Sequence, residues 1–570
     1  MSRENMRRAI RAGLVAGIVA VSISAIGMVE AFNERDVITN LLTLGIVLLY
    51  SAPLIGGYMA VDPDEKTKVG PTLVYGLVAG LLTAIPLIGL VFLTLLFPNI
   101  RDDLVNISPA LIEILTFGQG PILGSVILAV VMAVLGMVGA LFHILPEKIE
   151  KPILVGVSTV VIVGTFSGVI QLIRMVGNWL PRPIVRAIFG RQGIWIWTAV
   201  VIFALSAAIT AWWGSRGRKS YQERRAAMSE EQEKRFRRTG IITAILLAII
   251  FPLIFGPYHS EVLDVVGIFA IMGLGLNIVV GFAGLLDLGY VAFFAIGAYV
   301  MGLLTTSSDL AIAGMSFWAA LPIAVLASAT AGVLLGIPVL RMRGDYLAIV
   351  TLGFGEIIRV LALSDLLKPV IGGAQGILKV GKPQILNYVV VQPEWFYYLI
   401  LAGVVLAAFV SWRLRDARLG RQWMAMREDE TVAEATGIRL VNSKLLAFSI
   451  GAAFSGLAGA IFASRLSSIF PHSFNLLISI NVLCLIIVGG LGSIPGVVLG
   501  SFILVGVPLY LSEFTEYRLL IYGALLIATM LLRPEGLWPS AIRQRELHAE
   551  DEEAAREGSV VHREDVHPLM

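Results

Sequence analysis

Long apolar runs, separated by short polar segments, recur along the whole chain. A helix of about 20 apolar residues crosses a hydrocarbon layer of about 30 Å, and most of these runs approach or exceed that length. They predict membrane spans near residues 9–29, 37–60, 72–97, 121–145, 153–178, 193–213, 240–258, 262–281, 284–304, 317–340, 346–368, 396–412, 444–465, 474–491, 495–511 and 517–533. The 58 glycines indicate that some spans are broken or re-entrant. The pattern predicts an all-α polytopic membrane protein with about 16 transmembrane helices in two modules.

A charged segment divides these modules. Residues 1–214 form a membrane module of unknown role with about six spans, and 215–239 read as a charged cytoplasmic linker because they lack apolar periodicity. Residues 240–538 form the second transmembrane domain. The charged tail, 539–570, lacks a hydrophobic face, and we expect it to be disordered.

The distribution of basic residues predicts the orientation in the membrane. Arginines before the first span place the N-terminus in the cytoplasm by the positive-inside rule, and an even number of crossings returns the linker and the C-terminus to that side. One loop disagrees, because the arginines at 182, 186 and 191 would face outward. The expected location is the plasma (inner) membrane of a prokaryote.

The composition of the chain argues against several classes of function. Only 15% of the 570 residues are charged, against about 25% in soluble proteins, and 43 basic against 40 acidic residues do not indicate nucleic-acid binding. The single cysteine, Cys484, excludes an intrachain disulfide and a cysteine-based zinc site. Neither a Gly-x-x-x-x-Gly-Lys-Ser/Thr loop nor a His-Glu-x-x-His motif occurs. We therefore predict no catalytic residue, no metal ligand and no enzyme activity in this chain.

The most informative stretch is the glycine-rich run 273–299. Its glycines allow helices to approach closely or a helix to break. Asn277 and Asp287 are polar groups at the expected membrane depth, where such groups face a partner or an aqueous path. An equally weighted interpretation is that the glycines serve packing and that Asp287 caps a helix after a break.

Three further polar or glycine-rich segments follow. In 341–359, Glu356 and Arg359 are three residues apart and would pair on one helix face, as cavity lining or as a structural ion pair. The segment 413–438 is helix-permissive, ends at a glycine suited to a C-cap, and carries a modest apolar stripe interrupted by Glu430. The stripe, Trp423, Met426 and Ala433, would dock onto a soluble partner or belong to an ordinary interfacial helix. The glycines of 489–500 should break the chain around Pro495.

Together, these four motifs resemble the LivM-type permease subunits of branched-chain amino acid ABC importers, from about Gly273 to Trp538. The first 239 residues resemble nothing in that family and form an unrecognised N-terminal extension. In the family, the segment after residue 413 contacts the ATPase. The resemblance therefore implies that ATPase coupling involves Arg418, Gly420, Arg421, Arg427, Glu428, Glu430, Glu434 and Gly437. Two positions depart from the family pattern: Tyr290 stands where histidine is frequent, and Glu434-Ala435-Thr436 replaces Glu-Ala-Ala.

The resemblance implies that the chain works within a complex of several subunits. Two ATP-binding subunits would use the ATP, a second LivH-like permease would complete the pathway, and an extracytoplasmic binding protein would deliver the substrate. The chain itself would bind no cofactor and would contact lipid but no nucleic acid. The candidate pathway residues are Asn277, Asp287, Tyr290, Phe293, Phe294 and Glu356. An apolar path with few polar groups suits an amino acid with an apolar side chain.

Other functions stay open at this stage. Permeases of this type also handle urea or short-chain amides, because the binding protein largely sets selectivity. An ion-coupled secondary transporter would need buried carboxylates, for which Asp287 and Glu356 are the candidates. That hypothesis gives the polar segment 413–438 no purpose. The N-terminal module is the main argument for a third possibility, a non-transporting scaffold.

Overall fold

The computed structural model consists of two compact units, Met1–Ile245 and Leu246–Met570. It describes residues 3–61, 69–97, 104, 106–171, 182–190, 193–214, 230–339, 342, 345–386, 388–510, 517–533 and 535–539. Most of the predicted linker, 215–229, and of the predicted tail, 540–570, lies outside the described residues. Along the chain, the boundary between the units falls within one helix, α14 (Glu230–Phe255).

The described residues of the first unit are mostly helical, with one small hairpin and two isolated β-bridges at Ile194. Strands β1 (Asp36–Ile38) and β2 (Leu42–Thr43) pair antiparallel. Its helices are α1 (Arg3–Ala25), α2 (Met28–Ala31), α3 (Leu44–Met59), α4 (Val69–Leu96), α6 (Pro109–Thr116), α7 (Pro121–Leu141), the 3-10 turn η1 (Phe142–Ile144), α8 (Glu147–Thr165), α9 (Ser167–Gln171), α11 (Arg182–Ile188) and α12 (Ile196–Trp212).

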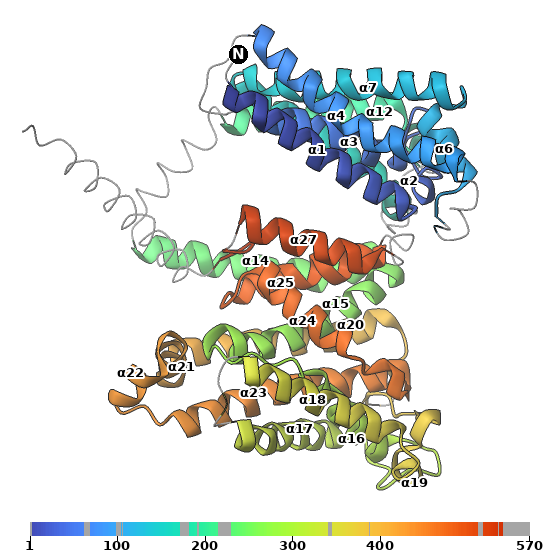
Figure 1. The fold of residues 1–570 in the computed structure, drawn as a ribbon. Coiled ribbons are helices and arrows are strands. Elements are labelled where there is room, and N and C mark those ends of the chain that lie inside the picture. Colours follow the sequence, from blue (N-terminus) through green and yellow to red (C-terminus); the bar gives the residue numbers. More distant parts are fainter. Residues whose placement is uncertain are drawn as a thin grey trace, which may run out of the picture. The chain divides into compact units, whose positions relative to one another are not determined.

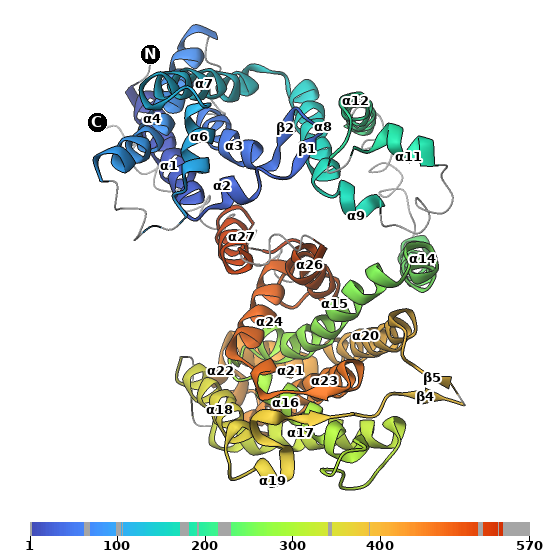
Figure 2. The ribbon, with the colours of Figure 1, turned by 90° about the vertical axis from the view of Figure 1, so that its right-hand side faces the viewer.

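Helices α1, α3, α4 and α7 pack together around an apolar core that includes Leu87 and Leu128 (Figure 1). Small residues bring these helices close, as membrane helices require in the absence of a hydrophobic force between them. A Cβ on Gly57 of α3 would lie only 2.0 Å from the Gly136 carbonyl oxygen of α7. Helix α8 packs against α12 beside this group (Figure 2).

The second unit contains the four motifs. Its elements are α15 (Pro257–Leu276), the π-helix η3 (Asn277–Phe282), α16 (Val291–Thr305), α17 (Phe317–Val339), α18 (Asp345–Leu363), α19 (Lys368–Ile371), η4 (Gly373–Gln375), β3 (Ile377–Leu378), β4 (Gln384–Ile385), β5 (Tyr388–Val389), α20 (Pro393–Asp416), α21 (Arg418–Glu428), α22 (Glu430–Ala435), α23 (Leu440–Leu466), β6 (Ser468–Ile469), η5 (Pro471–Ser473), α24 (Leu476–Gly489), α25 (Ile494–Ser501), the π-helix η6 (Phe502–Gly506), α26 (Val507–Tyr510) and α27 (Arg518–Leu532).

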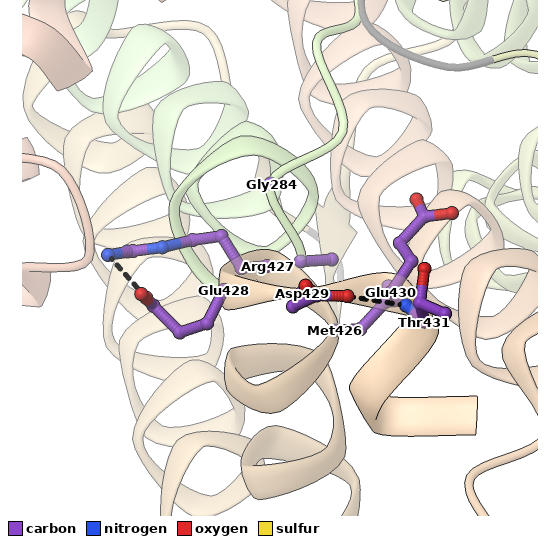
Figure 3. A pocket seen from close by; sticks show the side chains of 8 residues that line it. Gly284, Met426, Arg427, Glu428, Asp429, Glu430 and Thr431 are labelled. Carbon is purple, nitrogen blue, oxygen red and sulfur yellow. Dashed lines mark hydrogen bonds and ion pairs between the residues drawn. The ribbon is translucent and has the colours of Figure 1, made fainter. Parts of the chain in front are cut away.

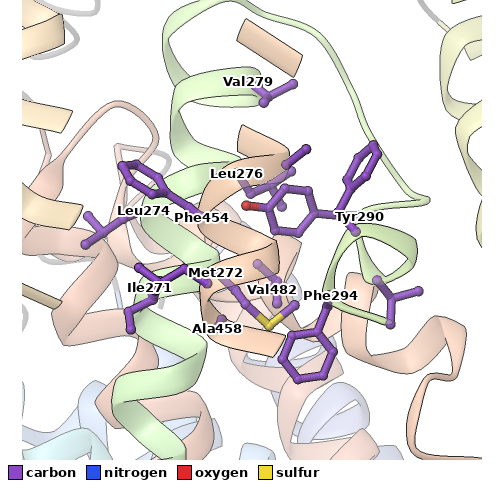
Figure 4. Close-up of a cluster of buried hydrophobic side chains, with 14 of the residues drawn as sticks. Ile271, Met272, Leu274, Leu276, Val279, Tyr290, Phe294, Phe454, Ala458 and Val482 are labelled. Carbon is purple, nitrogen blue, oxygen red and sulfur yellow. The ribbon is translucent and has the colours of Figure 1, made fainter. Parts of the chain in front are cut away.

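Helix α23 is central to this unit, because it packs along α15, α16 and α17. Figure 4 shows the buried cluster that joins α15 to α23, with Met272, Phe294 and Ala458 among its members. Strand β3 pairs antiparallel with β6, and β4 with β5. Figure 1 shows α21 and α22 at one end of the unit and α19 at the other.

The structure confirms the all-α polytopic class but not the number of 16 spans. Among the described residues, nine helices have the length and composition to cross a membrane, and five apolar helices are shorter. The predicted span 284–304 begins only at Val291, because the chain leaves the preceding helix through η3 and a loop in which Gly284 has a φ of +71°. The predicted span 495–511 contains η6. The expectation of an interrupted path is therefore confirmed before Val291, whereas Ile494–Tyr510 remains one continuous helix with a π-helical turn.

Candidate functional site

The polar segment between α20 and α23 folds into two short helices rather than one. Asp429 separates them, since its Oδ1 accepts hydrogen bonds from the amides of Thr431 (2.7 Å) and Val432 (3.0 Å) and so caps α22. Gly437 follows Thr436, the C-cap of α22, and has a φ of +89°, the left-handed conformation that favours the predicted glycine at this helix end. The Ile438 amide donates to the Ala433 carbonyl at 3.1 Å across this turn.

The apolar stripe of the segment faces the protein itself. Trp423 is fully buried and donates from Nε1 to the Ser443 carbonyl of α23 at 2.8 Å. Met426 and Ala433 are each 2% exposed. The stripe is therefore present, but the prediction that it docks onto a soluble partner is wrong, because α23 and the core of the unit already cover it.

Arg427 joins this segment to the first glycine-rich motif. Its Nη1 donates to the Gly281 carbonyl of η3 at 2.9 Å, and its Nη2 lies 3.3 Å from Glu428 Oε1. The last carbonyls of a helix have no partner within it, and a cation at that end satisfies them and the helix dipole. The guanidinium of Arg427 therefore caps the broken helix that ends α15.

An ion pair fixes α22 to α23. Lys444 Nζ lies 2.8 Å from Glu430 Oε1, with the lysine side chain 4% and the glutamate side chain 21% exposed. At the other end of the segment, Arg421 donates from Nη1 to the Asp416 carbonyl at 2.9 Å. Gly420 is buried against α20, where a Cβ would lie 2.3 Å from the Leu414 carbonyl oxygen. These contacts hold the segment on the membrane helices.

The remaining predicted coupling side chains point away from the core. Arg418, Arg421, Glu428 and Glu434 are exposed, as is Gly437. A pocket of about 280 Å³ opens beside them, lined by Ala283, Gly284 and residues 426–431. Figure 3 shows the loop at Gly284 directly beside Arg427, with Glu428 to one side and Glu430 and Thr431 to the other. The surface combines both charge signs around a hollow.

The predicted pathway residues of the first motif have partners inside the unit. Asn277 Oδ1 accepts from the Gly492 amide at 2.8 Å, which ties the first motif to the glycine run after α24. Asp287 Oδ1 accepts from the Gly289 amide at 2.9 Å and closes the turn before α16. Both side chains are fully buried.

The aromatic candidates lie in the core. Tyr290 and Phe293 are fully buried, Phe294 is 3% exposed, and the Tyr290 hydroxyl donates to the Gly451 carbonyl at 2.8 Å. Figure 4 shows Tyr290 and Phe294 within the buried cluster. Glu356 lies apart from them on α18, in the predicted pair with Arg359 at 2.8 Å, with the two side chains about one-third exposed. The structure thus joins the first motif to the third and fourth through Arg427 and Asn277. Helix α18 of the second motif also contacts the first motif, through Thr351 and the Leu288 amide (3.0 Å), whereas the Glu356 side chain pairs with Arg359.

One charged cluster was missed by the sequence reasoning. Arg465, near the end of α23, lies 3.0 Å from Asp264 Oδ2 of α15 and 3.5 Å from Glu261 Oε1. Asp264 is fully buried. Charged residues inside the predicted spans 262–281 and 444–465 were the available signal, because an ionised group in a membrane segment needs a partner. Among the described residues, no group of three or more metal-ligating side chains gathers.

Comparisons with known proteins point to one family. The family model described as "Branched-chain amino acid transport system / permease component" matches residues 258–530. The LivM permease protein of a high-affinity branched-chain amino acid transport system from Salmonella typhimurium is 40% identical over 330 residues, which cover 54% of this chain and 76% of that protein. The Escherichia coli K12 protein of the same name is 41% identical over the same length, with the same two coverages.

A paralogous permease is also similar. The LivH permease protein of Salmonella typhimurium is 28% identical over 295 residues, or 47% of this chain and 90% of that protein. No solved structure matches the chain. The family match begins at residue 258, so the first unit lies outside it.

Proposed function

Because the chain belongs to the family of branched-chain amino acid transport permease components, we propose that its second unit forms part of the membrane pathway of an ABC importer for branched-chain or related amino acids. The chain is a multi-pass membrane protein. We place it in the inner membrane of a prokaryote with both termini in the cytoplasm. A LivH-like permease would complete the pathway, and a binding protein would deliver the substrate from outside.

The hydrogen bond from Arg427 to Gly281 carries the mechanism. Two ATP-binding subunits, which bind and hydrolyse the ATP, would dock on the exposed charged side chains of α21 and α22. Their movement would pull on η3 through Arg427. Asn277 would pass that displacement to Gly492, between α24 and α25. This chain would carry out no catalysis and bind no nucleotide; it converts movement of its coupling helices into access for the substrate.

The candidate pathway residues have a revised role in this proposal. Since Asn277, Asp287, Tyr290, Phe293 and Phe294 are enclosed within the unit, they would shape the pathway by setting the positions of α15 and α16. Contact with the substrate would come from neighbouring surfaces as the helices shift. Glu356, about one-third exposed, is the candidate with access to a path shared with the second permease.

Transport by the assembled complex tests this function. Proteoliposomes containing this chain, both ATPases, the second permease and the binding protein are given labelled leucine or labelled urea, with and without a collapsed ion gradient. Leucine uptake that requires ATP and survives gradient collapse supports the proposal. Urea uptake under these conditions would keep the ABC importer and change the substrate. Uptake by this chain alone, lost with the gradient, would establish an ion-coupled transporter instead.

The docking face has its own test. Arg418→Glu reverses the charge of an exposed side chain on α21, and like charges brought together at an interface oppose association. The ATPase subunits should then copurify several-fold less with the permease. Asp365→Lys, an exposed charge reversal beyond α18, is the matched control and should leave copurification unchanged. Equal copurification of Arg418→Glu and the wild type would reject this docking face.

A further inference from the structure

The first unit contains a groove of about 980 Å³ between α1 and α3. Its mouth lies at the N-terminal end of α1, where Arg7, Arg8 and Arg11 line it together with Glu4. Beyond the mouth the lining is almost entirely apolar; its α1 wall includes Val15, Val19 and Ile23. One end of the groove is therefore cationic and the rest is hydrocarbon.

The two helices that form the groove run antiparallel. A Cβ on Gly56 of α3 would lie 3.0 Å from Ala16 Cβ, whereas one on Gly45, at the start of α3, would meet the Val29 carbonyl oxygen after α1. Met59 therefore lies near the cationic mouth, and Ser51 lies deeper. The Ser51 hydroxyl donates to the Leu48 carbonyl at 2.7 Å, which satisfies the polar group of that wall within its own helix.

The length of the groove fits one leaflet. From Arg11 to Ile23 a helix advances about 18 Å, slightly more than half of a hydrocarbon layer of about 30 Å. A molecule with an anionic head at the arginines would thus extend its chain along the apolar wall to about the middle of the membrane. Exposed side chains on both helices, Val15, Val19 and Ile55, border that path.

The cations at the mouth suit a phosphate. Within the described part of the chain, Arg7 and Arg11 form no ion pair. Guanidinium groups bind phosphate oxygens through two parallel hydrogen bonds. The cytoplasmic leaflet, where the proposed orientation puts this end of α1, is rich in anionic lipid. Three arginines with one glutamate keep the mouth positive.

We propose that this groove binds one anionic phospholipid, with its phosphate at Arg7 and Arg11 and an acyl chain against Val15, Val19 and Ile55. The lipid then bridges α1 and α3 and stabilises the first unit by mass action, since it binds only the folded helix pair. This assigns a ligand to a module that the family match does not cover.

Lipid retention tests the assignment. The purified full chain is delipidated in detergent and offered phosphatidylglycerol or phosphatidylcholine with identical acyl chains, and bound lipid is counted by native mass spectrometry. Preferential retention of one phosphatidylglycerol is expected. Glycerophosphoglycerol and inorganic phosphate are offered in separate arms. If either competes as well as the whole lipid, or if both lipids are retained equally, the proposal is overturned.

Two variant pairs locate the site. Arg11→Gln should weaken retention about five-fold, the effect of one basic residue near an anionic surface, whereas Lys148→Gln, an exposed cation on α8, should not. Val19→Trp fills the groove and should displace the lipid without a charge change. Ile18→Trp places the same bulk at a neighbouring side chain that is 61% exposed and lies outside the groove lining.

All four variants are first checked for wild-type elution in size exclusion, so that loss of lipid is not loss of fold. Equal retention within either pair overturns the site. A stoichiometric protein found in place of the lipid would also overturn it, because the occupant would then be a partner helix.

Discussion

Arg427 on α21 reaches the carbonyl oxygen of Gly281 at 2.9 Å and thereby connects a segment between two spans to the broken end of a third. These two residues are 146 positions apart in the chain. The bond pairs a side-chain cation with the end of a π-helix, whose carbonyls are not all satisfied internally. This hydrogen bond therefore joins α21 directly to η3.

We predict that Arg427→Ala uncouples transport from ATP hydrolysis. A hydrogen bond to a charged group contributes about 1.5–3 kcal/mol, so leucine uptake per ATP hydrolysed should fall by about ten-fold or more. Both rates are measured in the same proteoliposomes. Arg427→Lys keeps a cation near the carbonyl and should lose less. If uptake and hydrolysis decline in equal proportion in Arg427→Ala, the contact does not couple them.

A second prediction concerns the space at Gly281. A Cβ there would lie 2.2 Å from Asn277 Oδ1 and 2.8 Å from the Gly492 amide nitrogen. Gly281→Ala should therefore break the hydrogen bond between those groups and lower both thermal stability and uptake. Gly353→Ala on α18 is the control, since nothing lies within 4 Å of its Cβ position. It should be neutral or stabilise by about 0.4–1 kcal/mol. Equal melting temperatures for the two variants would contradict this account.

The ion pair between Glu430 and Lys444 predicts a double-variant pattern. Glu430→Gln leaves the Lys444 ammonium, whose side chain is only 4% exposed, without its anionic partner. An unpaired buried charge lowers the free energy of unfolding by several kcal/mol, and by about 3 kcal/mol or less here because the pair is partly solvated. Lys444→Met added to Glu430→Gln removes that charge. Thermal unfolding of the purified chain should show the double variant to be more stable than Glu430→Gln alone. The reverse order would mean that the pair does not anchor α22.

The cluster around Arg465 predicts that removing the arginine destabilises the protein more than removing the charge of Asp264. Arg465→Gln leaves the fully buried carboxylate of Asp264 without its cation, at a cost of about 3–5 kcal/mol. Asp264→Asn leaves Arg465 near Glu261, whose side chain is 63% exposed. The yield of folded chain in fluorescence-detected size exclusion should fall much more for Arg465→Gln. Comparable yields would show that Asp264 does not depend on this pair.

The class of the protein and the position of the polar segment 413–438 between two apolar helices could be predicted from sequence, because apolar length and charge depend on local composition. The pair of Glu356 and Arg359 also followed from helical spacing alone. The division of the segment at Asp429 could not be predicted, since one aspartate is compatible with a helix interior as well as with a cap. The inward direction of the Trp423 side chain could not be predicted either, because it depends on where α23 lies.

Asn277 and Asp287 are two residues whose partners the sequence could not identify. Polar groups at membrane depth indicate that a partner exists, but the sequence does not say whether the partner is a substrate or a backbone amide. The structure supplies the Gly492 and Gly289 amides. The role of Asn277 and Asp287 in shaping the pathway stays a prediction. The groove of the first unit could not be predicted from sequence either, because its lining comes from two helices whose packing the sequence alone does not give.

Helix α23 begins beside α22 and, after 27 residues, ends one residue before β6, which is paired with β3. At 1.5 Å per residue it is about 40 Å long, a rod that runs the full thickness of the membrane. Near its start, Lys444 pairs with Glu430 of α22 and the Ser443 carbonyl accepts from Trp423 of α21, so both short helices are attached to this end of the rod. The strand pair lies at its other end, so one continuous helix connects α21 and α22 with the loops at the opposite end of the unit.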